Sequence, residues 1–298
     1  MIEVPDLSAP AAPVPGELGG WRVRLAQNPL LLLGGAICVL ILLAAVFAPL
    51  LAPFPADAGS ATHPFAVLRP PTSQHWFGTD QVGRDVLSRV IYGARISPVV
   101  AFFVLLIACL IGIPLGIAAG FFGGWLDDVI MRVTDIFLAF PALLLALALA
   151  AVLPPSLTSL TIAISVTWWP WYTRLIRGQA ASVAGRPYIE SCRALGISRW
   201  RIIFRHILPN AITPLIVQIS LDVGGVILTA SALSFLGLGA QDPTPDWGLM
   251  VAEGQTYFTT DWWVVTFPGL AILITAFAFN LLGDGLRDLL DPKRIFLR

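Results

Sequence analysis

The sequence has few charged residues and few cysteines. Of its 298 residues only 12% are Asp, Glu, Lys or Arg, whereas 57% are hydrophobic, and the mean hydropathy is +0.81. This composition excludes an ordinary soluble globular domain and is typical of a chain that crosses a membrane several times. The cysteines are Cys38, Cys109 and Cys192, and their spacing suits neither a disulfide framework nor a metal site.

The motifs of several chemistries are also missing. No Gly-x-x-x-x-Gly-Lys-Ser/Thr loop is present to cradle a phosphate, so ATP must be bound by another chain. No nucleophile stands beside an oriented base, which argues against a catalytic membrane enzyme. His63 and His75 are single and scattered, and His206 is expected to cap or pack rather than to bind a metal. We expect no cofactor or metal in this chain and no nucleic-acid partner.

Six apolar runs are long enough to cross about 30 Å of hydrocarbon. They lie near residues 30–51, 96–122, 129–153, 157–172, 212–238 and 262–282. The fourth run is short and ends in the aromatic cluster 168–172, which is expected at a headgroup interface. In the second run, Gly112, Gly116 and Gly120 permit close helix packing. The sequence therefore predicts an all-α integral membrane protein with six transmembrane helices.

The chain divides into a tail, residues 1–28, and a membrane domain, residues 29–298. The tail is rich in proline and poor in apolar residues, which predicts a disordered segment. Arginine and lysine gather before the first run, in the loop after the fourth and at the C-terminus, so the positive-inside rule places both termini in the cytoplasm. The first loop breaks this pattern because Arg69, Arg84, Arg89 and Arg95 would lie outside.

A polar segment, residues 186–209, separates two of the apolar runs and is named here the 186–209 loop. Pro187 suits the first position of a helix, and Gly196 suits the left-handed residue that closes one. Ser198 can cap a second helix, which Pro209 would end. Two short helices at a tight turn would form a compact knob that another protein can grip.

The second helix of the loop is predicted to be amphipathic. Spacing places Trp200, Ile203, Phe204 and Ile207 on one face. Arg201 and Arg205 would form a cationic ridge on another face. On charge alone, an ordinary solvated basic loop is an equal interpretation.

Three separated blocks of residues resemble one family in the order that the family has them. In the 186–209 loop the pattern is carried by Glu190, Ser191, Cys192, Gly196, His206, Leu208 and Pro209. Residues 75–80 read HWFGTD and residues 83–85 read GRD, and residues 233–239 read LSFLGLG. The chain resembles a permease subunit of an ATP-binding-cassette importer of the dipeptide, oligopeptide and nickel group.

The resemblance implies a type I importer transmembrane fold and a set of partners. These are a second homologous permease, two ATPases that bind ATP and Mg, and an extracytoplasmic binding protein, all at the cytoplasmic membrane of a bacterium or archaeon. The 186–209 loop would be the coupling region that contacts the ATPases. Its candidate contact residues are Tyr188, Glu190, Ser191, Cys192, Arg193, Gly196, Arg201, Arg205, His206, Leu208 and Pro209.

The sequence departs from the family pattern at five positions, two of which are Asp242 and Asp246, where relatives commonly have a proline and a serine. Ser191 and Cys192 replace alanines, but both are small, so close packing of the knob against a partner survives. Ala230 stands where relatives usually have a glutamate, and any role of that glutamate is therefore in doubt here.

The outside-face motif comprises Gly78, Thr79, Asp80, Gly83, Arg84 and Asp85. The segment near 80–93 predicts an amphipathic helix on the outer membrane surface, with its valines, Leu87 and Ile91 on one side and its polar residues on the other. Asp85 and Arg89 stand four apart and can pair. The helix either helps to receive the binding protein or forms a structural collar that anchors the first two runs.

Asp222 is the ionisable residue that lies deepest in a predicted span. It either lines the translocation path, near a peptide amino group, or forms a hydrogen bond at the interface with the second permease. Peptides are the expected cargo by family frequency, with nickel complexes, glutathione or sugars as alternatives. A self-sufficient secondary transporter is the rival class, but its inverted repeats are not evident in this sequence.

Overall fold

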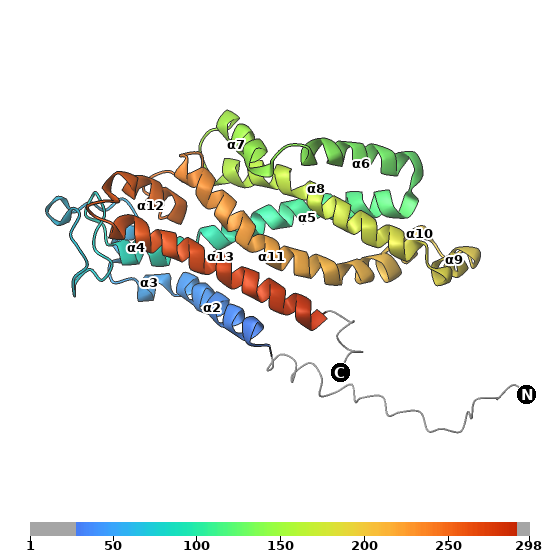
Figure 1. The fold of residues 1–298 in the computed structure, drawn as a ribbon, viewed down its shortest axis with the longest axis horizontal. Coiled ribbons are helices and arrows are strands. Elements are labelled where there is room, and N and C mark those ends of the chain that lie inside the picture. The colour runs from blue at the N-terminus through green and yellow to red at the C-terminus, as the bar shows by residue number, and fades with distance from the viewer. Residues whose placement is uncertain (1–27, 291–298) are drawn as a thin grey trace, which may run out of the picture.

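Helices make up nearly all of the computed structural model, which describes residues 28–290 (Figure 1). Five of them are long and run roughly along the longest axis of the molecule. They are α2 (Pro29–Val46), α5 (Ser97–Phe122), α8 (Leu157–Ala184), α11 (Leu208–Phe235) and α13 (Trp263–Leu290). The prediction for the tail 1–28 lies outside the described residues except at Asn28. Of the basic residues at the two ends that argued for the orientation of the chain, only Arg287 lies inside them, on α13.

Shorter elements gather at the two ends of the long helices (Figure 1). At one end lie α3 (Ala48–Leu51), η1 (Pro55–Ala58), η2 (Pro64–Ala66), α4 (Val86–Gly93), α12 (Trp247–Gly254) and η4 (Gln255–Tyr257). At the other end lie α9 (Pro187–Ala194), α10 (Arg199–Ile202) and the π-helical turn η3 (Ile203–Ile207). The family motif at 75–85 and the 186–209 loop therefore lie at opposite ends of the molecule.

Four stretches of helix in the described chain are long and apolar enough to cross a membrane. They are Pro29–Val46, Val86–Phe122, Arg199–Phe235 and Trp263–Leu289. A fifth crossing is possible if α6 (Gly124–Leu138) and α7 (Ala142–Val152) together form one broken span. The two meet at 84°, so the span predicted over 129–153 is not one continuous helix. Pro141 explains the break, because proline lacks an N–H and disfavours helical backbone at the preceding Phe140.

The helix α8 also differs from its prediction. The apolar run ends near Tyr172, but the helix continues for twelve more residues to Ala184. Within the aromatic cluster, Trp169 is 7% exposed and Tyr172 is fully buried, so these two rings belong to the core, whereas Trp171 is 54% exposed and still faces outward. The polar extension is held by ion pairs to α6, in which Arg177 binds Asp127 at 2.6 Å and Arg174 binds Asp135. This tertiary contact lets a helix run past the point where hydropathy falls.

The helices α5 and α8 pack closely against each other along a row of glycines. A Cβ atom on Gly116 would lie 2.6 Å from the carbonyl oxygen of Thr173, and one on Gly120 would lie 2.4 Å from that of Arg177. Gly112 meets Tyr172 and Trp169 in the same way. The predicted close packing at these glycines is thus confirmed, and it brings two backbones together as small residues do in membranes.

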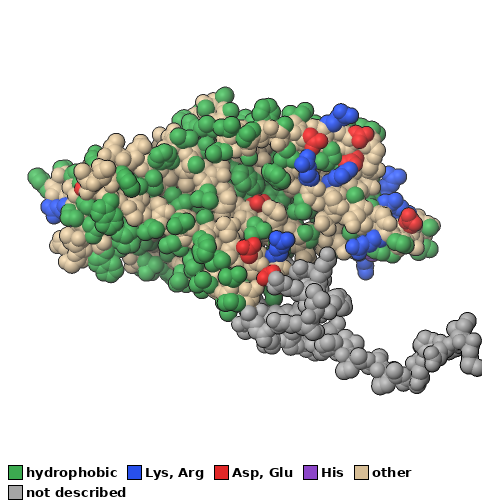
Figure 2. All heavy atoms as spheres, viewed as in Figure 1, with side chains coloured by type: hydrophobic (Ala, Val, Ile, Leu, Met, Phe, Trp, Pro, Cys, Tyr) green, Lys and Arg blue, Asp and Glu red, His purple; other side chains and the backbone are tan. Residues whose placement is uncertain are grey.

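Apolar side chains cover much of the outside of the long helices (Figure 2). On α2 alone, Leu32, Leu33, Val39 and Leu40 are each more than half exposed. In the view of Figure 2 the charged side chains gather mainly toward the end that carries α6, α9 and α10. Such an exposed apolar belt requires an apolar solvent, which the bilayer supplies.

We expect Gly116→Ala to destabilise the chain by about 1–3 kcal/mol, because its new methyl group would press on a backbone oxygen that cannot move aside. Gly178→Ala is the matched control: it lies in α8, and a Cβ there meets nothing within 4 Å. Thermal unfolding of the two variants in the same detergent measures the difference. Equal unfolding temperatures of the two variants would show that the α5–α8 contact accommodates the added methyl group without loss of stability.

Candidate functional site

The 186–209 loop folds into a helix, a tight turn and a second helix. Gly196 has a φ of +72°, the left-handed conformation predicted for it. The Ile197 N–H donates to the Cys192 carbonyl at 3.1 Å and the Gly196 N–H donates to that of Arg193 at 3.0 Å. This pair of bonds is the Schellman motif that ends many helices. Ser198 then accepts a hydrogen bond from the Arg201 N–H at 3.4 Å and caps α10, as predicted.

Pro209 does not end the second helix, and that prediction is wrong. The chain passes from α10 through the π-helical turn η3 straight into α11. Proline in a helix clashes with the carbonyl four residues back, here that of Arg205. The wider π turn immediately before Pro209 relieves this clash, so the loop is rigidly continuous with a membrane helix.

The apolar face predicted for this helix is split in two. Ile203 and Ile207 are buried, together with Ile202, whereas Trp200 and Phe204 are 67% and 64% exposed. The two exposed rings lie side by side, 6.2 Å apart between centroids. The helix thus carries two separate apolar surfaces, one for the core and one, formed by Trp200 and Phe204, that faces outward.

The remaining predicted residues of the loop lie around this frame. The Tyr188 ring meets His206 edge-on at 5.7 Å, and the Ser191 hydroxyl donates to the Pro187 carbonyl at 3.2 Å. Cys192 and Leu208 pack against the core, while Glu190, Arg201, Arg205 and Pro209 are exposed. Arg193 lies over the Phe121 ring of α5 at 5.1 Å. Sequence reasoning missed one apolar anchor of the loop: Ile189, a residue of α9, is fully buried.

At the opposite end of the molecule, the residues of the outside-face motif form a group of buried polar contacts. The Thr79 hydroxyl donates to the Ala66 carbonyl at 2.5 Å and accepts from the Arg69 N–H at 2.8 Å. Gly78 and Gly83 both have positive φ, and any side chain on them would collide with Trp263 and His63 respectively. Glycine is therefore required at both positions by conformation and by space.

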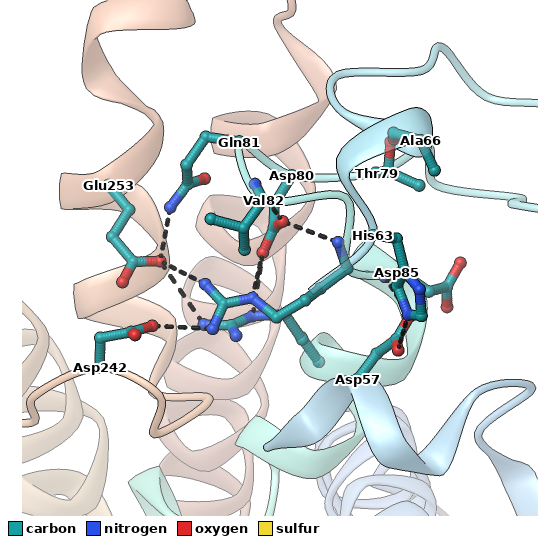
Figure 3. Close-up of polar contacts among 12 residues, drawn as sticks. Asp57, His63, Ala66, Thr79, Asp80, Gln81, Val82, Asp85, Asp242 and Glu253 are labelled. Carbon is teal, nitrogen blue, oxygen red and sulfur yellow. Dashed lines mark hydrogen bonds and ion pairs between the residues drawn. The ribbon is translucent and has the colours of Figure 1, made fainter. Parts of the chain in front are cut away.

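Two charged residues of this motif, Asp80 and Arg84, form a cluster with Arg89, Asp242 and Glu253 (Figure 3). Arg84 binds Asp80 at 2.7 Å and Asp242 at 2.7 Å, and its third nitrogen lies 3.6 Å from Glu253. Arg89 lies 3.7 Å from Asp80 and 3.5 Å from the same glutamate. The cluster joins the segment before α4 to the loop before α12 and to α12 itself, which are more than 150 residues apart in the chain.

The amphipathic helix predicted near 80–93 is present as α4, but its polar side is the buried one. Arg84, Asp85 and Arg89 are 2%, 1% and 0% exposed, so the helix does not lie with its polar side on a membrane surface. The predicted pair of Asp85 with Arg89 is also wrong. Asp85 instead accepts from the Ser88 N–H and hydroxyl and caps α4, while Arg89 turns toward Asp80 and Glu253.

Two histidine–aspartate pairs adjoin this cluster, although the sequence shows the histidines only as single residues. His75 meets Asp85 at 2.9 Å, and His63 meets Asp57 at 2.8 Å. The second carboxylate also accepts from the Asp85 N–H at 2.8 Å, which links the two pairs. In the described residues 28–290, no group of three or more His, Cys, Asp or Glu side chains is arranged to hold a metal.

Burial changes the acidity of these charges. Burial raises the pKa of Glu253, against the opposing effects of Arg89, a hydrogen bond from Gln81 and Arg84. Burial by itself would lower the pKa of Arg84, but Asp80 and Asp242 outweigh it and raise the pKa above its ordinary value. Arg84 therefore stays charged at any working pH. Arg89 is the least satisfied member, because its Nε and Nη1 atoms are buried without a hydrogen-bond partner.

Asp222 lies half-buried on α11, where it faces α8. Tyr172 donates a hydrogen bond to one carboxylate oxygen at 2.7 Å, and Gln218 donates to the other at 3.0 Å. Both donors belong to this chain, so the carboxylate is oriented before any partner arrives. Ala230, on the same helix, is 7% exposed and lies within the core.

The chain is a bundle of apolar helices with a rigid two-helix loop at one end and a buried cluster of charged residues at the other. This is the class of a membrane transport permease. The chain belongs to the family of binding-protein-dependent transport system inner membrane components, which it matches over residues 112–296. Residues 20–71 match the N-terminal TM domain of oligopeptide transport permease C.

Individual relatives agree with this assignment. The chain is 49% identical to the probable D,D-dipeptide transport system permease protein DdpC of Escherichia coli, over 92% of this chain and 90% of that one. It is 45% identical to the dipeptide transport system permease protein DppC of Alkalihalophilus pseudofirmus and 41% identical to the glutathione transport system permease protein GsiD of Pectobacterium atrosepticum, at the same coverage.

A solved structure supports the type I importer fold. It is an inward-facing form of the MetNI methionine ABC transporter, with a TM-score of 0.53 and 17% identity over 68% of this chain and 96% of the other. At this identity the likeness concerns the fold alone.

We expect Arg89→Met to cost about 3–5 kcal/mol of stability, because it leaves buried carboxylates facing one arginine fewer. Arg95→Met is the control, since Arg95 is exposed and a surface change of this kind usually stays within about 0.5 kcal/mol. Thermal unfolding in detergent checks both. A stability of Arg89→Met equal to or above that of the control would mean that the cluster does not hold α4 to α12.

Proposed function

We propose that this chain is one of two permease subunits of an ATP-driven importer of dipeptides or oligopeptides in a bacterial or archaeal cytoplasmic membrane. Family membership supports the importer class, and the absence of a phosphate-binding loop from the sequence assigns ATP and Mg to separate ATPase subunits. The second permease would complete the pathway, and six crossings would result if α8 and the α6–α7 pair each count as one.

The cargo proposal draws on what the relatives are named for. Two of them are dipeptide permeases and a third is a glutathione permease, so a small peptide-like solute is the class that they share. Nickel complexes and sugars remain alternatives that the wider family allows. Selection among them would reside mainly in the binding protein.

The 186–209 loop is the observation that carries the proposal. It is closed by a Schellman turn at Gly196, anchored by Ile189 and continuous with α11 through η3. A rigid knob of this kind transmits the closure of two ATPases to a membrane helix, whereas a flexible loop would absorb the movement. We assign this end of the molecule, and both termini, to the cytoplasm.

The opposite end would then receive the extracytoplasmic binding protein. The motif around Gly78 to Asp85 is stiffened by the buried charge cluster, and Asp242 extends from that cluster to the surface with its side chain 62% exposed. We assign the motif the role of a fixed collar that positions α4 and α12 beneath the binding protein.

We expect Gly196→Arg to abolish co-purification of the ATPases from native membranes, because a side chain at this left-handed position strains the turn by about 1–2 kcal/mol and moves the knob. Gly185→Arg is the matched control: it is equally exposed and lies on the other side of α9, but its φ is −84°. Mass spectrometry identifies the bound proteins. If the intact chain never carries an ATPase, the importer proposal fails.

We further propose that Asp222 lines the translocation path, near the amino group of the peptide. Asp222→Asn keeps the shape but removes the charge, and we expect peptide uptake to fall roughly tenfold with the ATPases still bound. Tyr172→Phe, which removes one hydrogen bond and keeps the charge, should have a smaller effect. Equal losses in the two variants would indicate an interface hydrogen bond instead.

A further inference from the structure

A hollow of about 410 Å³ lies between the 186–209 loop and the end of α5. Its walls are of two kinds, one apolar and one cationic. The lining residues are Phe121, Phe122, Ile197, Ile202, Arg193 and Arg199. Four of these residues belong to the 186–209 loop, which we assign to coupling with the ATPases, but the exposed aromatic pair of that loop, Trp200 and Phe204, is not part of the lining.

The two arginines reach into the hollow from either side of the Gly196 turn. Arg193 lies 5.1 Å above the Phe121 ring and Arg199 lies 5.9 Å from the Phe122 ring, both as cation–π contacts. Within residues 28–290 neither arginine forms an ion pair with a carboxylate. The nearby arginines of α8 do have such pairs, with Asp127 and Asp135. The hollow thus presents two positive charges that no acidic group of the described chain neutralises.

Exposed aromatic residues at the end of α5 and the start of α6 point to headgroup depth for the hollow. Phe122, the last residue of α5, is 44% exposed, and Trp125, just past the turn into α6, is 75% exposed. Large aromatic side chains exposed at the end of a membrane helix are typical of the membrane–water interface. An occupant of the hollow would therefore have its polar part at the surface and its apolar part against α5.

We propose that this hollow binds the phosphate headgroup of an anionic phospholipid of the cytoplasmic leaflet. Two guanidinium groups on one side suit the oxygens of a phosphodiester, since arginine forms strong paired hydrogen bonds to phosphate. Phe121, Phe122 and Ile202 offer an apolar wall to the start of the acyl chains. Basic pockets at the cytoplasmic ends of membrane helices bind such headgroups in other proteins. The inference rests on the proposed orientation but not on the proposed cargo.

Lipid retention by the purified importer complex tests the proposal. The complex is delipidated in detergent, incubated with equal amounts of phosphatidylglycerol and phosphatidylcholine, and examined by native mass spectrometry. We expect the intact chain to retain phosphatidylglycerol and the double variant Arg193→Gln/Arg199→Gln to retain it about 30-fold less, at roughly fivefold per arginine. The control is Arg201→Gln/Arg205→Gln, which removes the same charge from the same loop outside the hollow.

Four outcomes would overturn the proposal. Equal retention of the two lipids would show that the hollow has no preference for an anionic headgroup, and equal losses in the two double variants would leave only a general attraction to charge. Binding of glycerol 3-phosphate as tight as that of the lipid would make the hollow a site for a soluble anion. If the lipid is retained only after the ATPases are removed from the complex, the hollow is a protein contact. Should the glutamine variant fold poorly, Arg193→Lys/Arg199→Lys keeps the charge and should keep at least half of the retention. Because the readout is lipid binding, its failure is distinguishable from a failure of uptake or of ATPase attachment.

Discussion

The close contact between α5 and α8 is the constraint on which both ends of the molecule depend. Helices in a bilayer gain little from hydrophobic burial against each other, so they associate by close packing at small residues. The row Gly112, Gly116 and Gly120 lets the two backbones touch. The helix α5 begins just after α4 and ends at the hollow, and α8 leads into the 186–209 loop. The α5–α8 pair therefore connects the buried charge cluster at one end of the molecule to the 186–209 loop at the other (Figure 1).

The two ends use charge in opposite ways. At the end with the family motif, Arg84 and Arg89 are buried against Asp80 and Glu253, where each charge needs its partner because water is excluded. At the other end, the arginines of the loop are exposed and lack carboxylate partners in the described chain, which leaves them available to other molecules. The first arrangement fixes geometry, and the second provides surfaces for binding.

Much of the site could be read from the sequence because its signals are local. Pro187, Gly196 and Ser198 act through the conformation and hydrogen bonds of their nearest neighbours, so their positions alone predict the turn and the caps. The burial of Arg89 could not be read in this way. Its partner Glu253 lies 164 residues further along the chain, and a polar side of a short helix gives no sign of whether it meets water or another charge.

The sequence by itself determined the membrane class, the family and the existence of a two-helix loop, because composition, spacing and turn residues report on short stretches of chain. Tertiary structure alone decided where the helices end and which sides are buried. It extended α8 beyond Tyr172 and carried the helix through Pro209. For α8, the free energy of contacts with distant residues outweighed the weak preference that hydropathy expresses. At Pro209, the local widening of the backbone removed the clash by which a single proline usually ends a helix.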